Sequence, residues 1–309
     1  MTASVAYLGP EGTFTHQAAL EWAERAGYGP DAVVPRESVG QVHDAVASGE
    51  VDRGVVAIES SVEGYVVPSL DALVGSPDVV AVDEVVLGVS FDAFVRPGHG
   101  ELTEATAHPH GLAQVTRFVA DRGLRPVPAP SNAAACRDAG PHQVAFGPRL
   151  CGRLYGLETL ATAVEDVPGA RTRFLVLARR AEARFERGGG DWRTMLAITP
   201  VVTGPGVLAR VTTAFGARGV NMSSLISRPL KARAQQYVFV VTFDAAPWAP
   251  EARGLLADLL AAGDSLKTLG AYPAQPGEGG LDGVLPDHVP AGSVSASDAE
   301  TVRAAGLLW

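Results

Sequence analysis

Short apolar runs alternate with helical patterns along the first 87 residues. Residues 5–8 (VAYL) form an apolar run that ends at Gly9-Pro10, which predicts a buried strand. Residues 15–27 repeat small apolar side chains at the helical period, so we expect a helix there with Thr15 as its N-cap. Further strands are predicted at 54–58 and 79–87, and further helices at 39–48 and 66–74. This alternation is typical of an α/β domain with largely parallel sheets.

The pattern restarts near residue 88, which indicates a second lobe. Strands are expected at 105–107 and 144–146, and helices at 109–122, 132–139 and 149–155. The chain then returns with a strand at 172–177. We therefore expect one domain over residues 1–180, with lobe 1 at about 1–87 and 165–180 and lobe 2 at about 88–164.

The C-terminal part has a different order of elements. Residues 181–192, which include three successive glycines, are predicted to be a linker. Residues 193–272 then predict a strand, a helix, two strands, a helix and a strand, which is the ferredoxin-like βαββαβ order. The last segment, 273–309, is rich in Gly, Pro and Ser, and we expect it to be loosely packed.

Composition limits the kinds of partner. Apolar residues make up 47% of the 309 residues and charged residues 19%, which is typical of a globular chain. The net charge of −9, without any basic block, argues against nucleic acid or an anionic membrane as partner. No secretory signal or uncharged apolar stretch of spanning length is evident. We expect Cys136 and Cys151 to be buried and reduced, and the protein to be cytoplasmic.

Five short polar motifs lie at the ends of predicted strands or the starts of predicted helices. They are residues 9–15 (GPEGTFT), 58–66 (IESSVEGYV), 108–110 (HPH), 131–134 (SNAA) and 170–174 (ARTRF). In the last motif a hydroxyl and a guanidinium are adjacent, which suits an acidic substrate with a leaving hydroxyl. The first and fourth motifs open helices, whose N–H groups and positive dipole ends can bind a carboxylate. The net negative charge of the protein repels anions, so local donors of this kind would be needed to hold an anionic substrate.

With these motifs in this order, the chain resembles the prephenate dehydratases of phenylalanine biosynthesis. The resemblance covers roughly residues 4–273 and continues into a C-terminal segment, 193–272, that resembles an ACT regulatory domain. It implies a two-lobed catalytic domain like the periplasmic binding proteins, with a cleft between the lobes, and no cofactor or metal. The implied substrate is prephenate, a small dianion.

The motifs and the resemblance together nominate the site residues. The expected catalytic residues are Thr172, Arg173, Ser60, Glu59 and His110. The expected substrate-binding residues are Gly12, Thr13, Ser61, Gly64, His108, Ser131, Asn132 and Phe174. By resemblance, Thr172 is the proton donor or orienter of the departing hydroxyl, and Arg173 is a substrate anchor or a local electrostatic brace.

Two positions in the expected catalytic lobes depart from the family pattern. Ser60 stands where the family has Asn, and it offers one donor where Asn offers two and an acceptor. His110 stands where many members have Gln, and an imidazole there could act as acid, base or carboxylate partner. Loss of the Asn near the ring hydroxyl is a change that could alter the product.

Regulation and assembly are expected from the C-terminal segment. The expected effector-binding residues are Gly206, Val207, Leu208, Asn221, Ser227 and Arg228. Ile226 replaces the Glu of the family's phenylalanine-binding motif, which puts regulation by phenylalanine in question. We expect a homodimer or homotetramer held largely by residues 193–272, through the helix face of Val207, Val211 and Phe215 and the edges of strands 220–227 and 237–243.

Three functional hypotheses therefore stand. The first is a prephenate dehydratase, which Thr172 favours. The second is a non-aromatising prephenate decarboxylase that keeps the ring hydroxyl, which Ser60 favours. The third is a non-catalytic keto-acid or amino-acid sensor, against which the retained Thr172-Arg173 pair argues.

Overall fold

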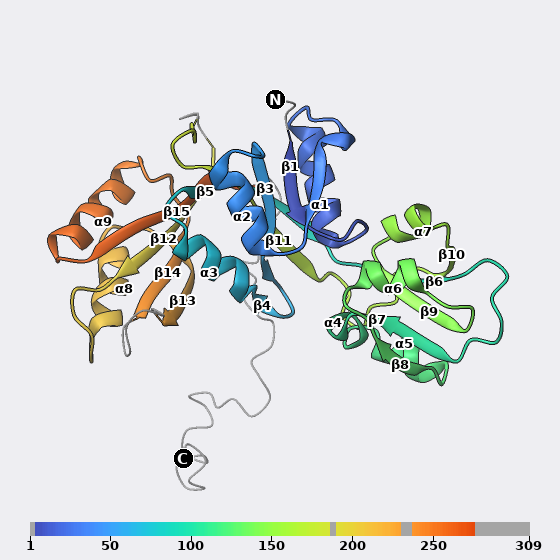
Figure 1. The fold of residues 1–309 in the computed structure, drawn as a ribbon. Helices are drawn as coiled ribbons and strands as arrows, with labels where there is room; N and C mark the ends of the chain where they lie inside the picture. Colours follow the sequence, from blue (N-terminus) through green and yellow to red (C-terminus); the bar gives the residue numbers. More distant parts are fainter. Residues whose placement is uncertain (1–3, 186–189, 230–236, 276–309) are drawn as a thin grey trace, which may run out of the picture.

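Three parts lie in a row in the computed structural model, which describes residues 4–185, 190–229 and 237–275. Lobe 1 is in the middle, lobe 2 lies on one side of it, and the C-terminal βαββαβ unit lies on the other (Figure 1). Two sheets confirm the predicted two-lobed architecture. The expectations for residues 276–309 and for residues 186–189 of the predicted linker lie outside the described residues.

One large sheet runs through lobe 1 and the C-terminal unit, in the order β13-β14-β12-β15-β5-β11-β3-β1-β2, with β4 pairing β3. The strands of lobe 1 are β1 (Val5–Leu8), β2 (Val33–Arg36), β3 (Arg53–Ser60), β4 (Gly64–Tyr65), β5 (Val79–Gly88) and β11 (Arg171–Arg179). The helices of lobe 1 are α1 (Phe14–Arg25), α2 (Val39–Ser48) and α3 (Val67–Gly75), with a short 3-10 turn η1 (Pro30–Ala32). Here β1 pairs parallel with β2 and β3, whereas β11 runs antiparallel to both β3 and β5. The sheet is therefore mixed and not largely parallel.

Lobe 2 has its own five-stranded sheet in the order β10-β6-β9-β7-β8. Its strands are β6 (Asp92–Val95), β7 (Glu104–Ala107), β8 (Arg125–Pro128), β9 (Gln143–Gly147) and β10 (Glu158–Ala161). Its helices are α4 (Pro109–Leu112), α5 (Thr116–Asp121), α6 (Asn132–Asp138) and α7 (Leu150–Tyr155). The predicted helix 109–122 is split into α4 and α5 because Asp166, distant in sequence, accepts from the N–H groups of Thr116 and Arg117 and caps a new helix there.

The C-terminal unit confirms the predicted βαββαβ order. Its elements are β12 (Trp192–Thr199), α8 (Val207–Ala217), β13 (Met222–Pro229), β14 (Tyr237–Phe243), α9 (Pro250–Ala261) and β15 (Ser265–Pro273). Two details of the assembly prediction are wrong. Val211 and Phe215 are buried against the unit's own sheet, so they offer no face to a partner. Strand β14 lies between β13 and β12, so of the two strands expected as edges only β13 lies at an edge of the sheet.

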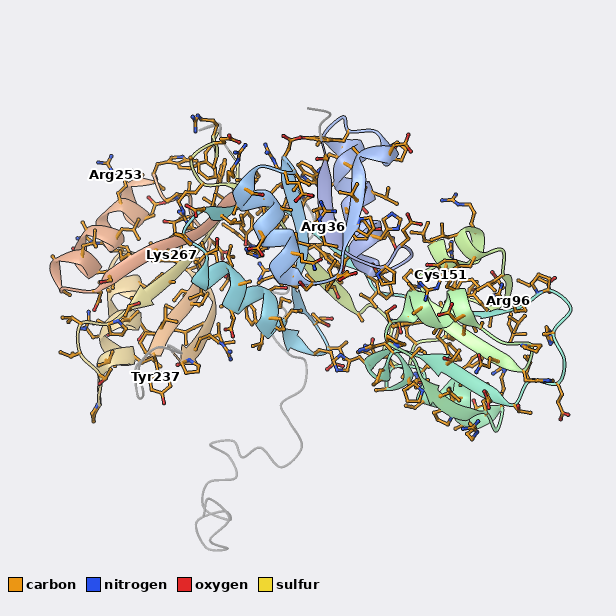
Figure 2. All side chains as sticks on the ribbon, viewed as in Figure 1. Arg36, Arg96, Cys151, Tyr237, Arg253 and Lys267 are labelled. Atoms are coloured by element: carbon orange, nitrogen blue, oxygen red, sulfur yellow. The ribbon has the colours of Figure 1, made fainter. Side chains whose placement is uncertain are left out.

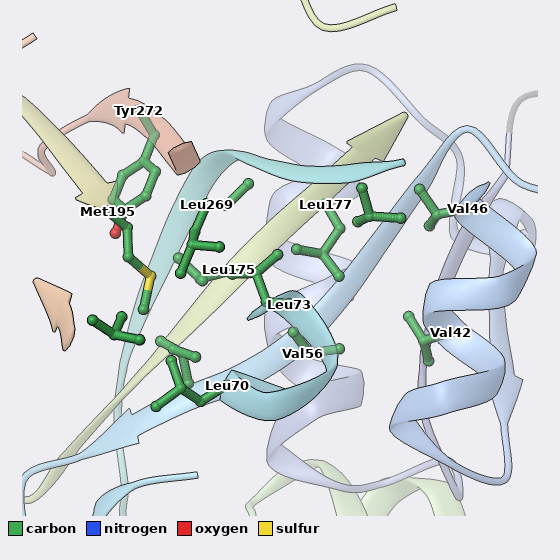
Figure 3. Packing of buried hydrophobic residues seen from close by; sticks show 14 of the residues in the cluster. Val42, Val46, Val56, Leu70, Leu73, Leu175, Leu177, Met195, Leu269 and Tyr272 are labelled. Atoms are coloured by element: carbon green, nitrogen blue, oxygen red, sulfur yellow. The ribbon is translucent and has the colours of Figure 1, made fainter. Parts of the chain in front are cut away.

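A shared hydrophobic core joins the C-terminal unit to lobe 1. Met195 and Tyr272 of the unit pack in one cluster with Leu70 and Leu73 of α3 and with Leu175 of β11 (Figure 3). The strands of the C-terminal unit join those of lobe 1 where β15 pairs parallel with β5, at Gly270 opposite Ala81. A Cβ at Gly270 would lie 2.7 Å from that of Ala81, so only glycine permits this approach. Within the described residues, no helix is long and apolar enough to cross a membrane.

Candidate active site

A cavity of about 690 Å³ lies between the two lobes. Lobe 1 contributes Leu8, Gly9, Pro10, Thr13, Phe14, Thr15, Glu37 and Ala57, and lobe 2 contributes His108, His110, Pro130, Ser131, Asn132, Ala134, Arg137 and Asp138. A second cavity of about 850 Å³ shares Gly9, Glu37 and Arg137 with it, so the cleft continues toward Arg36 and Tyr155. Three of the five predicted motifs contribute to the lining.

Strand β11 carries Thr172 directly opposite Ser60 of β3. Alternation along β11 places Thr172 on the same face as Phe174 and Val176, which pack against α1, whereas Arg173 lies on the other face with Leu175. Ala57 of β3 shares the α1 side and lines the cavity. Thr172 is half-buried, and it stands on the cleft side of the sheet without being among the lining residues of the cavity.

Strand β3 carries an extra residue at this point. The register steps from Glu59 opposite Arg173 to Ala57 opposite Phe174, so Ile58 is inserted as a β-bulge. Bulges of this kind re-aim side chains beside functional sites. The next residues close the motif: the Ser60 hydroxyl accepts from the N–H groups of Val62 and Glu63, and the Ser61 hydroxyl accepts from that of Arg171.

Arg173 is buried and turned away from the cleft. It pairs with Glu59, and its Nη1 lies 3.9 Å from Oε2 of Glu84. Burial alone would lower the pKa of Arg173, but Tyr272, Glu59 and Glu84 together raise it above its usual value, so it is charged. Of the two expected roles, the geometry favours the electrostatic brace over the substrate anchor.

Four of the expected binding residues do not line the cavity, namely Gly12, Ser61, Gly64 and Phe174. Phe174 is 1% exposed and belongs to the core beneath α1, so its predicted contact with substrate is wrong. Gly64 is exposed as the first residue of β4, where a φ of +76° accounts for the glycine. Phe174 and Gly64 belong to recognised motifs, but here they have structural roles, in the core and at a backbone position of positive φ.

The glycine-rich turn before α1 already uses two of its expected donors, the Gly12 N–H and the Thr13 hydroxyl, in internal hydrogen bonds. The Gly12 N–H donates to Nδ1 of His16, and the Thr13 hydroxyl donates to the Pro10 carbonyl while it accepts from the His16 N–H. Thr13, not Thr15, is therefore the N-cap of α1. Burial lowers the pKa of His16, so its ring is neutral. The expectation that Gly12 and Thr13 offer free donors to a carboxylate is not supported.

Lobe 2 keeps more of its predicted donors available. Ser131 caps α6 through its oxygen, which accepts from the Ala134 N–H and leaves the O–H proton for a ligand. The Asn132 carbonyl oxygen accepts from the His108 N–H, which leaves the two amide N–H donors. His108 and His110 meet edge to face at 4.9 Å, and burial, followed by the nearby His110, lowers the pKa of His108.

Arg137 is a cleft residue that the motif analysis missed. It follows Ser131 on the same short helix and lines both cavities, where it pairs with Asp138. The signal for it was present, since a cation near a helix-opening motif is informative in a chain of net charge −9. Arg137 gives the cleft a guanidinium that can bind an anionic substrate, although Asp138, its partner, lines the same cavity.

Helix α7 of lobe 2 touches the turn of lobe 1 at two points. The Tyr155 hydroxyl donates to the Glu11 carbonyl over 2.6 Å, and the Cys151 thiol donates to the Gly12 carbonyl over 3.2 Å. Figure 2 shows Cys151 at the edge of lobe 2 that faces lobe 1. Cys136 and Cys151 are both buried and unbridged, as predicted.

The expected effector residues of the C-terminal unit are spread over two places. Gly206 has a φ of +84° and precedes α8, which begins at Val207, and Leu208 is exposed. Asn221 donates to the Asp244 carboxylate over 2.5 Å. These residues form the surface at the start and the end of α8.

The other two effector residues lie on β13, at the boundary with lobe 1. Ser227 is exposed, whereas Arg228 forms a bidentate pair with Asp71 of α3 at 3.0 and 3.1 Å. Ile226 packs against the core shared with lobe 1. An apolar side chain at this position therefore has a packing role of its own.

Comparison with known proteins gives one consistent family. The family profile "PDT: Prephenate dehydratase" matches residues 5–182. A prephenate dehydratase of Amycolatopsis methanolica is 36% identical over 272 residues, which cover 87% of this chain and 88% of that protein. The structure of a prephenate dehydratase from Arthrobacter aurescens, in complex with L-Phe, is 28% identical with a TM-score of 0.79 and 99% coverage of both chains.

One similar structure has a different described activity. It is presented as a novel type of quorum quenching acylase, and it is 28% identical with a TM-score of 0.77, covering 88% of this chain and 98% of its own. Since one fold can carry different chemistry, the reaction has to be argued from the residues of the cleft.

Proposed function

The chain belongs to the prephenate dehydratase family, and on that premise we propose that it converts prephenate to phenylpyruvate. The observation that carries the proposal is the position of Thr172, on the cleft side of β11 and opposite Ser60. In the reaction the bond to the ring carboxylate breaks and releases CO2, and its electrons make the ring aromatic. The bond from the ring to the hydroxyl breaks in the same process, and this oxygen takes up a proton and leaves as water.

The protein has to supply that proton and hold the substrate in line. A threonine hydroxyl is a weak acid, so Thr172 needs support from a neighbour. Directly opposite residues on antiparallel strands bring their side chains to within about 5 Å. The Ser60 oxygen already accepts two N–H bonds, so its own O–H is left to donate toward Thr172. Such a donation makes the Thr172 proton easier to give to the leaving hydroxyl.

The substrate carboxylates need donors on the opposite wall. Ser131 has an O–H donor and Asn132 has N–H donors for which no partner lies among the described residues, and Arg137 adds a guanidinium that is paired with Asp138. His110 stands at the same wall and can serve as a further partner. We assign these four residues to binding and the Thr172–Ser60 pair to proton transfer.

A direct assay tests this function. Purified protein is incubated with prephenate, and phenylpyruvate is followed by its absorbance in base while product NMR reports the ring. Aromatic product with loss of the hydroxyl is expected. No consumption of prephenate would leave the non-catalytic sensor as the better account.

The second candidate, a decarboxylase that keeps the ring hydroxyl, is favoured by one observation, the Ser at position 60. A product that is not aromatic and retains its hydroxyl would establish it. Ser60→Asn then restores the family residue and should shift the product toward phenylpyruvate. An unchanged product ratio would move attention to His110.

We also propose that the C-terminal unit is an ACT-type regulatory domain and that phenylalanine binds it weakly. Ile226 cannot accept a hydrogen bond from an amino group, and an unpaired donor costs about 1–3 kcal/mol, or roughly a 5- to 150-fold loss of affinity. Calorimetric titration with phenylalanine should show no micromolar binding. Tight binding with clear inhibition would contradict this, and the same sample in analytical ultracentrifugation tests the expected dimer or tetramer.

A further inference from the structure

Four charged side chains meet inside the protein at the boundary between lobe 1 and the C-terminal unit. We call Glu59, Glu84, Arg173 and Arg193 the buried charge cluster. Glu84 of β5 is 0% exposed and lies between the two guanidinium groups, with Arg173 Nη1 at 3.9 Å and Arg193 Nη1 at 3.3 Å. Arg173 pairs with Glu59 on its other side. Two negative and two positive charges therefore balance in a site that is largely removed from bulk water, with only the Glu59 side chain partly exposed.

The cluster joins the strand of the proposed catalytic residue to a separate unit of the chain. Arg173 follows Thr172 on β11, whereas Arg193 belongs to β12 of the C-terminal unit. Both arginines pair with Glu84. Burial raises the pKa of Glu84, and the two arginines oppose that rise, so each contributes to keeping the carboxylate charged.

The surroundings leave few substitutes for Arg193. The main-chain N–H of Gln275 lies 3.3 Å from Glu84 Oε1, and Tyr272 of β15 is buried nearby. Asp244, the more exposed neighbour of Arg193 at 3.8 Å, brings a further negative charge. Without Arg193 the cluster would carry one excess negative charge. Arg173 alone would then have to pair with both Glu59 and Glu84.

We propose that Arg193 and Glu84 are positioning residues for the reaction, so that the C-terminal unit contributes to the catalytic site by fixing Arg173 and, through it, the Thr172 hydroxyl. This inference rests on the proposed function of Thr172. Arg173 holds the backbone of β11 beside the bulge of β3, where a small rotation moves the adjacent side chain on the other face. A displacement of about 1 Å of a catalytic group can reduce the rate by as much as 100-fold.

The test is a double-mutant cycle with prephenate consumption as the readout. Arg193→Met should lower kcat by roughly 10- to 100-fold and change KM by less than about threefold, because Arg193 does not line the cleft. Adding Glu84→Gln to that variant restores charge balance, with Arg173 and Glu59 remaining, and should recover most of kcat. Arg193→Lys keeps the charge and should lose less than the Met variant.

The matched control is Arg218→Met. It breaks a bidentate pair with Asp258 at 2.6 and 2.8 Å in the same unit, but on its exposed helices, and should leave kcat unchanged. Circular dichroism and melting temperature accompany each variant, and rates are measured well below the lowest melting temperature. If Arg193→Met does not fold, Glu84→Gln alone carries the test, and it too should lower kcat at unchanged KM.

The outcomes separate the inference from the proposed function. A kcat within twofold of wild type in folded Arg193→Met or Glu84→Gln would overturn the inference, as would a double variant no faster than Arg193→Met. Wild-type protein that consumes no prephenate would overturn both. Formation of phenylpyruvate by the wild type, together with the predicted loss and recovery, supports both.

Discussion

Lobe 1 is joined to its two neighbours by opposite means. Toward lobe 2 the contacts are a polar cleft, two hydrogen bonds from α7 and the edge-to-face pair of Phe14 with Phe91. Toward the C-terminal unit there is a continuous sheet, a shared apolar core and the buried charge cluster. The first boundary can open with little loss of buried apolar surface, whereas the second cannot open without exposing its core.

This difference indicates that the boundary between the lobes moves and that the boundary with the C-terminal unit is rigid. The segments that pass from β5 to β6 and from β10 to β11 connect the lobes, and we expect them to act as hinges when the cleft closes on substrate. The C-terminal unit and lobe 1 should move as one body. An effector bound to that unit would then act on the strands beneath Thr172 and not through a loose tether.

The largest expected effect is at Thr172 of β11, the strand that carries Thr172 on the cleft side and Arg173 in the buried charge cluster. Thr172→Ala should reduce kcat by roughly 10²–10⁴-fold if its hydroxyl assists proton transfer. Its melting temperature should stay near that of wild type, because Thr172 is only half-buried. Thr172→Ser, which keeps the hydroxyl, should retain much of the rate, and Thr159→Ala on an exposed strand of lobe 2 serves as control. Near-normal turnover in the Ala variant would remove Thr172 from the mechanism.

The next effect tests how tightly the C-terminal unit is joined to lobe 1. In Gly270→Ala the new Cβ would lie 2.7 Å from the Ala81 Cβ and 3.1 Å from its carbonyl oxygen. Overpacking of this kind costs about 3 kcal/mol at the upper end of its usual range, and urea unfolding measures it. Gly88→Ala, on the same strand as Ala81 with nothing within 4 Å, should be nearly neutral. Equal stability of the two variants would mean that β15 of the C-terminal unit and β5 of lobe 1 are not closely packed.

Acid should weaken the same boundary. His43 of α2 is 5% exposed, and burial lowers its pKa to about 4, with Lys267 of the C-terminal unit adding to the shift. Below the unfolded pKa of about 6.5 the unfolded chain takes up a proton that folded His43 refuses, so stability is complete above pH 6.5 and falls as the pH approaches 4. The loss should reach about 2 kcal/mol at pH 5.

Urea unfolding of His43→Leu at pH 7 and pH 5 isolates this contribution. Neither ring nitrogen of His43 has a hydrogen-bond partner within the described residues, so the substitution should be tolerated. The variant should lose less stability between the two pH values than wild type. Identical pH dependence would assign the acid sensitivity to other groups.

The smallest effect belongs to the boundary between the lobes. Tyr155→Phe removes the hydroxyl that donates to the Glu11 carbonyl, at a cost of about 0.5–1.5 kcal/mol. We expect a small change in melting temperature and a raised KM, since the lobes lose one contact that holds them together. Tyr237→Phe, at the exposed first residue of β14 in the C-terminal unit, should change neither. A large loss of stability would show that the lobes are joined as firmly as the other boundary.

Local patterns predicted the elements well and their pairing less well. The apolar runs of β1 and β5 and the βαββαβ order follow from periodicity, but the order of strands depends on contacts between distant residues. The meeting of β15 with β5 is of this kind, although a glycine inside a strand, Gly270, is a known sign of close approach. Short edge strands such as β8 and β10 were missed because their sequences alternate weakly.

For the candidate site, the motifs located the right segments but not the direction of each side chain. Thr172 and Arg173 were read as one pair, yet strand alternation turns them to opposite faces. Phe174 was counted as a ligand contact, but it lies beneath α1 in the core. The link from Arg173 through Glu84 to Arg193 had no sequence signal, since it joins three strands far apart in the chain.

Native-state hydrogen exchange tests most directly whether lobe 1 and the C-terminal unit are one body. Amides of β15, β12, β5 and β11 should exchange in a single opening, with one common free energy near that of global unfolding. Amides of lobe 2, in β6 and β9, should exchange through a separate opening of lower free energy. If the C-terminal strands instead open independently of β5 and β11, with a lower free energy of their own, the account is contradicted.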